Sequence, residues 1–514
     1  MSAPIQFLPR TQVERLLGGA RPGDVIHLVG AGGCGMSGLG HLLLDLGFRL
    51  TGSDLVCGLE VEQLRRRGAS ITEGHASSFA HGPRPVLVVQ TSAVKGDNPE
   101  IRAAAARGIP LARRGVVLAA LARRTQAVCV AGMHGKTTTS ALLAHAMDRL
   151  GLEPAYAIGA LLNDGKCHAR LRGSGPEGPP YFVLETDESD GTLAEFEPEH
   201  AILLNVDAEH LDHFGSLARV CEAFAAFARR VKRRLVYCRD DLHLDRLCAG
   251  QAGAVSYGVH PAADYRLVLQ SGPASADGTL RSFEVLHQQT SLGDFAVALP
   301  GEKNASNALA VVALLHQLGQ SPERIAAALA GFPGTCRRQQ LLFEGGGIKI
   351  YDDYGHHPSE IRVTLRALKP PGGGRLLVAF QPHRYTRTQH LLREFATAFH
   401  DADALWLTEI YAASEPPIPG VNGELLARAV RSAGQPVRYV ERLDDLEQAV
   451  LEDLREGDTL LFLGAGDITR VAHNAAALLE RRLGRGRVIT GCGSGEAAVS
   501  AGSRALNCPS VLCA

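Results

Sequence analysis

Short apolar runs rich in Val, Ile and Leu recur along this chain of 514 residues and alternate with longer stretches of helical periodicity. Such runs are typical of strands that are buried on both faces of a sheet. Their alternation with helices predicts an α/β fold with mainly parallel sheets, because a parallel connection needs a crossover segment. The predicted strands cover residues 25–29, 86–90, 127–132, 182–186, 201–205, 375–380 and 459–464. Two amphipathic helices are predicted over residues 140–150 and 389–399.

The length and two breaks in this pattern predict three domains and a tail. At about 150 residues per domain, a chain of 514 residues corresponds to three or four domains. One break precedes the strand at 127–132, and the second is at 331–338, where a predicted helix ends at Gly331. We therefore predict domains at residues 1–122, 123–333 and 334–483, and a flexible tail at 484–514.

Composition excludes several classes of protein. Lys and Arg number 53 and Asp and Glu number 54, so the net charge of −1 provides no long-range attraction for nucleic acid. No apolar run approaches the roughly 18 residues that a membrane helix needs, and we recognise no signal peptide. The 11 cysteines are isolated, without a CxxC pair, so we expect reduced thiols, no zinc site and a cytoplasmic protein.

A glycine-rich loop follows the first predicted strand. Gly30, Gly32 and Gly35 fit the pattern G-x-G-x-x-G, in which backbone approaches a pyrophosphate at a helix N-terminus. Asp54 follows Gly32 by 22 residues, near the position of an acid that binds ribose. The loop alone suggests NAD, but any nucleotide diphosphate satisfies the same physics, and a packing turn without a ligand is the plain alternative.

A second glycine loop follows the predicted strand at 127–132. Its sequence, GMHGKTTT, places Lys136 and Thr137 where a phosphate-binding loop has the lysine for the β/γ-phosphates and the hydroxyl for Mg²⁺. The loop is shorter than the G-x-x-x-x-G-K-[ST] pattern, since Val130 stands where the first glycine belongs. We interpret it as an ATP-binding loop rather than a plain turn.

Acidic clusters follow two further strands. Glu185 begins the segment ETDESD, and His210 lies in the segment NVDAEHLD. Carboxylates at the carboxyl end of a strand suit Mg²⁺, which prefers oxygen ligands, although a solvated acidic turn has the same composition. His210 is a candidate second metal ligand or a structural histidine.

Two polar segments lie near the C-terminal part of the chain. The segment DDYGHHP contains Tyr354 and His356, and QPHRYTR contains Arg384 and Arg387 before a predicted helix. Two arginines three residues apart at a helix entrance can clamp a carboxylate, or they can be exposed residues of a helix face. Nothing local decides whether the histidine is an acid, a base or a hydrogen-bonding group.

Taken in order, these segments resemble the Mur ligase family over about residues 22–480. The resemblance rests on a dozen motifs in register, among them GAGGCGMSG, GMHGKTTT, ETDESD, NVDAEHLDHF, YDDYGHHPSEI and AFQPHRYTRT. It implies a domain that binds a UDP-sugar, a central ATPase domain and a Rossmann-like C-terminal domain. It also implies ATP-dependent ligation of L-alanine to the lactyl carboxylate of UDP-N-acetylmuramate in peptidoglycan synthesis, with two Mg²⁺ ions.

The resemblance also implies roles for individual residues. Those expected to bind the UDP-sugar are Gly30, Gly32, Gly33, Gly35, Met36, Ser37, Asp54, Thr91 and Ser92. Those expected to bind ATP are Gly132, Met133, His134, Gly135, Lys136, Thr137, Thr138, Asn304, Asn307 and Arg338. The expected metal ligands are Thr137, Glu185 and His210, and the expected catalytic residues are Lys136, Tyr354, His356, Arg384 and Arg387.

Three positions depart from the family pattern. Lys303 replaces the usual histidine, Gln339 replaces the usual phenylalanine, and a glutamate expected near Val116 is missing. Three alternatives to the alanine-adding activity stay open: a peptide-adding ligase of cell-wall recycling, an NAD-dependent dehydrogenase and a non-catalytic nucleotide-binding regulator. We expect only small-molecule partners, with the chain a monomer or a homodimer.

Overall fold

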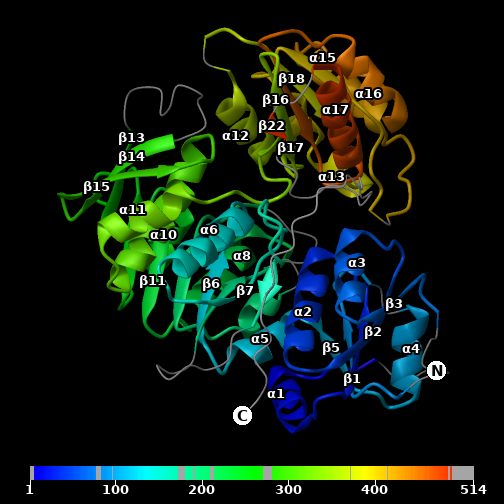
Figure 1. The fold of residues 1–514 in the computed structure, drawn as a ribbon, viewed down its shortest axis with the longest axis vertical. Helices are drawn as coiled ribbons and strands as arrows, with labels where there is room; N and C mark the ends of the chain where they lie inside the picture. The colour runs from blue at the N-terminus through cyan, green and yellow to red at the C-terminus, as the bar shows by residue number, and fades with distance from the viewer. Residues whose placement is uncertain are drawn as a thin grey trace, which may run out of the picture.

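Three β-sheets, one in each successive part of the chain, organise the protein (Figure 1). The computed structural model describes residues 5–76, 83–94, 97–171, 180–188, 191–208, 214–269, 281–370, 372–413, 415–483 and 487–488. Helices pack on the faces of all three sheets, so the predicted α/β class with mainly parallel sheets is confirmed. Within the described residues, no helix is both long enough and apolar enough to cross a membrane.

The first sheet has five strands in the order β3-β2-β1-β4-β5, all parallel. Its strands are β1 Val25–Val29, β2 Arg49–Asp54, β3 Ser70–Glu73, β4 Leu87–Gln90 and β5 Leu111–Arg113. The accompanying helices are α1 Arg10–Gly19, α2 Cys34–Asp45, α3 Leu59–Arg66, α4 Pro99–Ala106 and α5 Arg114–Ala122. The strand order places the carboxyl end of β1, where the first glycine loop begins, in the middle of the sheet.

The second sheet has ten strands in the order β15-β14-β13-β12-β11-β10-β6-β9-β7-β8. Its strands are β6 Gln126–Ala131, β7 Ala155–Ala157, β8 Ala169–Arg170, β9 Tyr181–Glu185, β10 His200–Leu203, β11 Arg234–Cys238, β12 Ala254–Gly258, β13 Tyr265–Leu269, β14 Arg281–His287 and β15 Thr290–Val297. Its helices are α6 Lys136–Arg149, α8 Leu217–Ala228, α9 Leu242–Cys248, α10 Glu302–Gln317 and α11 Pro322–Ala330, with a 3₁₀ turn at Thr192–Glu195. Strand β6, which precedes the second glycine loop, lies between β9 and β10, so the loops after all three strands meet at one edge of the sheet.

The third sheet has seven strands in the order β20-β19-β18-β21-β17-β16-β22. Its strands are β16 Gln340–Gly345, β17 Ile348–Asp353, β18 Leu376–Phe380, β19 Ala404–Leu407, β20 Arg438–Tyr439, β21 Thr459–Leu463 and β22 Arg487–Val488. Its helices are α12 Pro358–Leu368, α13 Tyr385–His390, α14 Leu392–Ala396, α15 Gly423–Ser432, α16 Leu443–Leu451 and α17 Ile468–Leu483.

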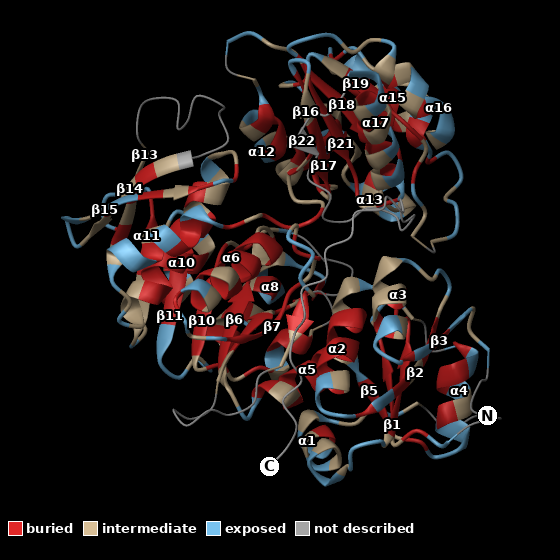
Figure 2. Ribbon diagram, in the orientation of Figure 1, coloured by how far each residue is buried: buried red, intermediate tan, exposed pale blue. Residues whose placement is uncertain are grey.

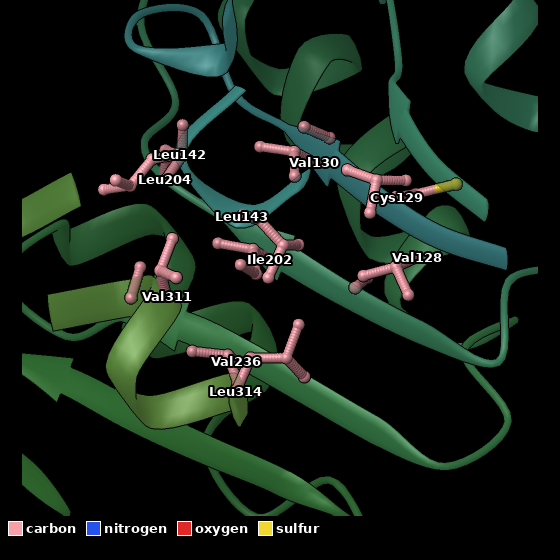
Figure 3. Packing of buried hydrophobic residues seen from close by; sticks show 14 of the residues in the cluster. Val128, Cys129, Val130, Leu142, Leu143, Ile202, Leu204, Val236, Val311 and Leu314 are labelled. Atoms are coloured by element: carbon pink, nitrogen blue, oxygen red, sulfur yellow. The ribbon is translucent and has the colours of Figure 1, made fainter. Parts of the chain in front are cut away.

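The core around the central sheet explains why its strands appear in the sequence as continuous apolar runs. Val128 and Val130 on β6 and Ile202 on β10 are fully buried. Leu142 on α6 and Val311 on α10 are also fully buried in this cluster, and Figure 3 shows side chains from both helices packed against the strands. Figure 2 shows the same burial along the strands of all three sheets. A strand covered on both faces needs apolar residues at every position, which removes the alternating pattern of a half-exposed strand.

The seven predicted strands correspond to β1, β4, β6, β9, β10, β18 and β21, each within one or two residues at its ends. The helix predicted over 140–150 lies in α6, which already begins at Lys136. The single helix predicted over 389–399 is wrong: the chain forms α13 and α14, and Leu391 between them has φ −105° and ψ 20°. The helical apolar pattern persists through this interruption, so periodicity alone could not reveal it.

Two further expectations need correction. The strand β22 pairs with β16, so the predicted flexible tail is wrong for Arg487–Val488; the other residues of 484–514 lie outside the described residues. Cys336 is disulfide-bonded, so the expectation of reduced thiols throughout is wrong there. Seven cysteines among the described residues are free, namely Cys34, Cys57, Cys129, Cys167, Cys221, Cys238 and Cys248. The sheets, apart from β22, fall within the three predicted domain ranges, whose boundaries stay predictions.

Candidate active site

The second glycine loop joins β6 to the N-terminus of α6, and we call it the phosphate loop after its sequence pattern. It needs glycine at two positions. Gly132 has φ 142°, and a Cβ there would lie 2.9 Å from Leu204 Cβ. Gly135 has φ 86°, and a Cβ there would lie 3.0 Å from Asn307 Oδ1. Both constraints keep the backbone close to its neighbours and leave the N–H groups of the helix start open to an anion.

The Lys136 ammonium is held inside this loop. Its Nζ donates hydrogen bonds to the carbonyl oxygen of Gly132 at 2.6 Å and to both carboxylate oxygens of Glu188 at 2.8 and 2.9 Å. Burial disfavours the charged amine, but the carboxylates of Glu188 and Asp187 outweigh it and raise the pKa of Lys136. Lys136 is therefore positively charged at neutral pH and is available to offset phosphate charge.

Two side chains with oxygen atoms suited to a metal ion lie beside this lysine. Thr137 Oγ1 donates to Glu185 Oε1 at 2.9 Å, and Glu185 Oε2 accepts from the backbone N–H of Gly159 at 2.7 Å. A hydroxyl and a carboxylate at a phosphate loop are the oxygen donors that Mg²⁺ uses, with phosphate oxygens and water completing an octahedron. The predicted ligands Thr137 and Glu185 thus fit Mg²⁺, while His210 lies outside the described residues.

A cavity of about 300 Å³ opens between the central and C-terminal sheets. We call it the central cavity; its lining includes His134, Gly135, Thr138, Lys303, Asn304, Asn307, Arg338, Gln339 and Glu360. Asn304 Nδ2 donates to Gln339 Oε1 at 2.9 Å. Gln339, which departs from the family pattern, therefore positions an asparagine expected to bind ATP. Lys303, which also lines this cavity and also departs from the family pattern, has its pKa lowered by burial.

A second cavity, of about 400 Å³, joins all three parts of the chain. We call it the junction cavity; its lining includes Gly33, Cys34, Gly35, Met36, Thr91, Ser92, Lys136, Thr137, Glu185, Arg338 and Tyr354. The first glycine loop, the phosphate loop and the C-terminal arginine and tyrosine therefore face one space. An anionic substrate in this space can approach Lys136 and Thr137 directly.

The first glycine loop is fixed by its neighbours. Gly30 has φ 83°, and a Cβ there would lie 2.5 Å from Thr91 Cγ2, so only glycine fits. Asp54 Oδ2 accepts from the backbone N–H of Gly32 at 2.7 Å, and Asp54 Oδ1 accepts from that of Val56 at 3.2 Å. Asp54, which is expected to bind the UDP-sugar, thus holds the loop backbone. Ser37 is fully buried, and its Oγ donates to the carbonyl oxygen of Cys34.

The predicted catalytic residues of the C-terminal part separate into two groups. Tyr354 lines the junction cavity, and the Arg338 guanidinium lies 5.1 Å from the centroid of its ring. The backbone carbonyl oxygen of Tyr354 lies 2.9 Å from His356 Nδ1. Burial lowers the pKa of His356 to about 4, so this ring is neutral at neutral pH. Arg384 and Arg387 line neither cavity. Arg387 Nη1 lies 3.0 Å from Nδ1 of His383, whose ring centroid is 5.4 Å from that of His356.

Three family models match the chain in succession. They are described as Mur ligase family, catalytic domain (residues 25–126), Mur ligase middle domain (130–315) and Mur ligase, glutamate ligase domain (337–466). A UDP-N-acetylmuramate–L-alanine ligase of Myxococcus xanthus is 42% identical over 459 residues, which cover 88% of this chain and 95% of that protein. The chain belongs to the Mur ligase family.

Solved Mur ligase structures agree with this assignment. The crystal structure of the UDP-N-acetylmuramate-alanine ligase MurC from Thermotoga maritima matches with a TM-score of 0.77 and 30% identity, covering 89% of this chain and 99% of that one. A murein peptide ligase from Psychrobacter arcticus shares the fold at a TM-score of 0.64 and 23% identity, covering 88% and 99%. The family membership predicted from the motifs is therefore confirmed.

Sequence reasoning missed several polar residues of this Mur ligase site. Asp207 and Glu360 lie on either side of His134, and Glu188 holds Lys136. Asn205 binds both the N–H and the carbonyl of His134 through its side chain, at 2.8 and 2.9 Å. All four lie within motifs that the sequence analysis quoted, but their roles depend on which strands are neighbours.

Proposed function

We propose that this Mur ligase joins L-alanine to the lactyl carboxylate of UDP-N-acetylmuramate and releases ADP and phosphate. The observation that carries the proposal is the 42% identity over 88% of the chain to a ligase named for this reaction. The junction cavity supports it, because a UDP-sugar held by the first glycine loop would present a carboxylate to the phosphate loop. We place the reaction in the cytoplasm as a step of peptidoglycan synthesis.

The chemistry requires activation of the carboxylate. A carboxylate oxygen attacks the γ-phosphorus of ATP, the bond to the β-phosphate oxygen breaks, and an acyl phosphate and ADP form. The alanine amine, after losing a proton, attacks the acyl carbon, and the resulting tetrahedral intermediate expels inorganic phosphate. Two anions must approach in the first step, so the protein has to offset charge and fix orientation.

The residues of the two cavities supply these functions in our proposal. Lys136 offers positive charge to the transferred phosphate, and the N–H groups from Gly132 to Thr138 hold the polyphosphate. Arg338, whose Nη2 lies 3.4 Å from Thr137 Oγ1, brings a second positive charge from the C-terminal part. Thr137 and Glu185, with His210, would hold Mg²⁺. When bound, Mg²⁺ neutralises phosphate charge.

The C-terminal residues would bind the amino acid. We assign Tyr354, His356, Arg384 and Arg387 to the alanine and the reacting carboxylate, with the arginines suited to carboxylate recognition. His356, being neutral, can accept a hydrogen bond from the alanine amino group. Because neither arginine lines the junction cavity, the assignment requires movement of this segment when substrates bind. Closure of the C-terminal domain would also exclude water from the acyl phosphate.

A peptide-adding ligase of cell-wall recycling is the second candidate. The ligase for L-alanyl-γ-D-glutamyl-meso-diaminopimelate from Neisseria meningitidis matches at 26% identity and a TM-score of 0.55, covering 61% of this chain. That likeness is weaker and shorter than the one to the alanine ligases. Both candidates use the same UDP-sugar and ATP and differ in the acceptor amine.

The test measures phosphate release from ATP and Mg²⁺ with UDP-N-acetylmuramate, offering L-alanine, glycine, D-glutamate and an L-alanyl-γ-D-glutamyl-diamino-acid tripeptide separately. We expect turnover with L-alanine and little or none with D-glutamate or the tripeptide. Turnover with the tripeptide alone would move the protein to cell-wall recycling. No phosphate release with any of the four acceptors would show that the protein lacks the ligase reaction.

A further inference from the structure

Two histidines and a cysteine meet where helix α2 contacts the central sheet, outside both cavities. His41 lies on α2, and Cys167 and His168 directly precede β8. Helix α2 contacts β7 and β8, and Figure 1 shows it beside β7. One ligand atom of each residue lies within 4.8 Å of the other two. The sequence has no CxxC or other metal-binding spacing here, because the residues come from two separate parts of the chain.

Each imidazole ring of this His41–Cys167–His168 cluster carries a buried nitrogen that has no hydrogen-bond partner among the described residues. The side chains of His41 and His168 are 1% and 0% exposed. His41 Nε2 and His168 Nδ1 make no hydrogen bond with the described residues. A buried polar atom without a hydrogen-bond partner destabilises the fold, so a ligand that uses both nitrogen atoms would remove that cost.

The opposite ring nitrogens are already occupied. His168 Nε2 lies 3.0 Å from the carbonyl oxygen of Cys34 and 3.1 Å from Ser37 Oγ. Donation of the Nε2 proton to that carbonyl leaves the lone pair on Nδ1, the usual arrangement for a histidine that binds a metal. On the other ring, His41 Nδ1 lies 3.1 Å from Arg67 Nη1.

We propose that the His41–Cys167–His168 cluster binds a Zn²⁺-class ion through His41 Nε2, His168 Nδ1 and Cys167 Sγ, with water as the fourth ligand. Imidazole nitrogen and thiolate sulfur are the ligands that Zn²⁺ prefers, whereas Mg²⁺ takes oxygen ligands. The site is therefore chemically distinct from the oxygen ligands at the phosphate loop.

Binding requires two local changes. The Cys167 thiol loses its proton to solvent as the bond from sulfur to the metal forms. The proton of the neutral His41 ring moves to Nδ1, so Arg67 Nη1 turns away from that nitrogen. Arg67 keeps its ion pair with Asp45, in which Nη2 lies 2.6 Å from Oδ1. Its side chain is 38% exposed, which gives it room for this movement.

A bound ion would join helix α2 to the edge of the central sheet next to the first glycine loop. It would connect α2 to the segment before β8, and His168 already contacts the loop through Cys34 and Ser37. We therefore expect the ion to fix this loop on the central domain and to raise the melting temperature, since it binds the folded state alone.

The experiment titrates metal-free, full-length protein with Co²⁺ and follows absorption, with Zn²⁺ as the competitor. We expect one equivalent to give a thiolate-to-cobalt charge-transfer band in the near ultraviolet, which Zn²⁺ abolishes. Cys167→Ser should remove the band, and His168→Gln should weaken binding at least about tenfold. Cys221→Ser, a control at a free cysteine outside the cluster, should keep the band.

Thermal unfolding separates a lost site from a lost fold. Zn²⁺ should raise the melting temperature of the wild type and of Cys221→Ser but not that of Cys167→Ser, while the metal-free forms melt at similar temperatures. Absence of the band in the wild type would overturn the proposal. So would a band that survives Cys167→Ser and disappears in Cys34→Ser, because the ion would then lie in the junction cavity.

Discussion

His134 of the phosphate loop and Glu360 of α12 are 226 positions apart in the sequence, yet His134 Nδ1 lies 3.3 Å from Glu360 Oε1. The other ring nitrogen of His134 lies 3.2 Å from Asp207 Oδ2. The histidine is thus held between one carboxylate from the central part and one from the C-terminal part. This contact links the position of α12 directly to the phosphate loop.

Glu360→Gln should weaken that link. Glutamine keeps the size of the side chain and one acceptor oxygen but removes the charge that faces His134. Hydrogen bonds to charged groups contribute about 1.5–3 kcal/mol, so we expect kcat/KM for ATP to fall about tenfold or more. Initial rates of phosphate release against ATP concentration measure this. Glu394→Gln, at an exposed position on α14, is the control, and equal rates for both variants would contradict the prediction.

Acid should remove the stability that Glu360 contributes. Burial opposes ionisation, but the hydrogen bond from His134 and nearby positive charges hold the pKa of Glu360 well below its ordinary value. In the unfolded state the pKa of this carboxyl group is about 4.3. Between the folded and unfolded pKa values, the unfolded state therefore binds more protons than the folded state. The contribution is fully present above about pH 4.3 and is lost as the pH falls toward the folded pKa.

Urea unfolding at a series of pH values measures this effect. In Glu360→Gln the free energy of unfolding should depend less steeply on pH in the acid range than in the wild type. Asp207, whose pKa is lowered to about 2 mainly by its hydrogen bond with His134, contributes in the same direction and leaves a residual slope. Parallel curves for the two proteins would show that the charge of Glu360 does not stabilise the fold.

Lys136→Ala should abolish ADP release and leave binding of the UDP-sugar nearly intact. The substitution also leaves the Glu188 carboxylate, which is 0% exposed, without its ammonium partner, and breaking a buried pair costs about 3–5 kcal/mol. The double variant Lys136→Ala, Glu188→Gln should therefore recover much of the stability but none of the ADP release. Calorimetry with the UDP-sugar, thermal melts and an ADP assay separate these effects. Turnover by either variant would show that the phosphate-loop assignment is wrong.

Asp54→Ala should impair binding of the UDP-sugar rather than of ATP. It removes the acceptor for the backbone N–H groups of Gly32 and Val56, so the first glycine loop loses its anchor. We expect KM for UDP-N-acetylmuramate to rise about five- to tenfold, since one such hydrogen bond contributes about 1 kcal/mol. Asp54→Asn, which keeps one acceptor oxygen, should be intermediate. A rise in KM for ATP alone would contradict the prediction.

Local requirements of the backbone explain what the sequence predicted well. Gly30, Gly132 and Gly135 have positive φ and close neighbours, so their spacing after apolar runs marked both loops without knowledge of the fold. The strands were recognisable because burial on both faces demands apolar residues at every position. The assignment of residues to ATP, the UDP-sugar and alanine came from motif resemblance and stays a prediction.

Contacts between segments that are distant along the chain could not be predicted from the sequence. The break at Leu391 and the pairing of Arg487–Val488 with β16 depend on neighbours that periodicity does not record. The pairing of Lys136 with Glu188 depends on β6 and β9 being adjacent.

The sequence by itself determined the strands, the glycine loops and the family, because these depend on residues close together along the chain. Only the tertiary structure decided that His134 meets Glu360, that Asp54 holds the first loop and that His41 meets Cys167 and His168. Hydrogen bonds and metal coordination act over a few ångströms of space, and sequence separation carries no information about which distant side chains come that close.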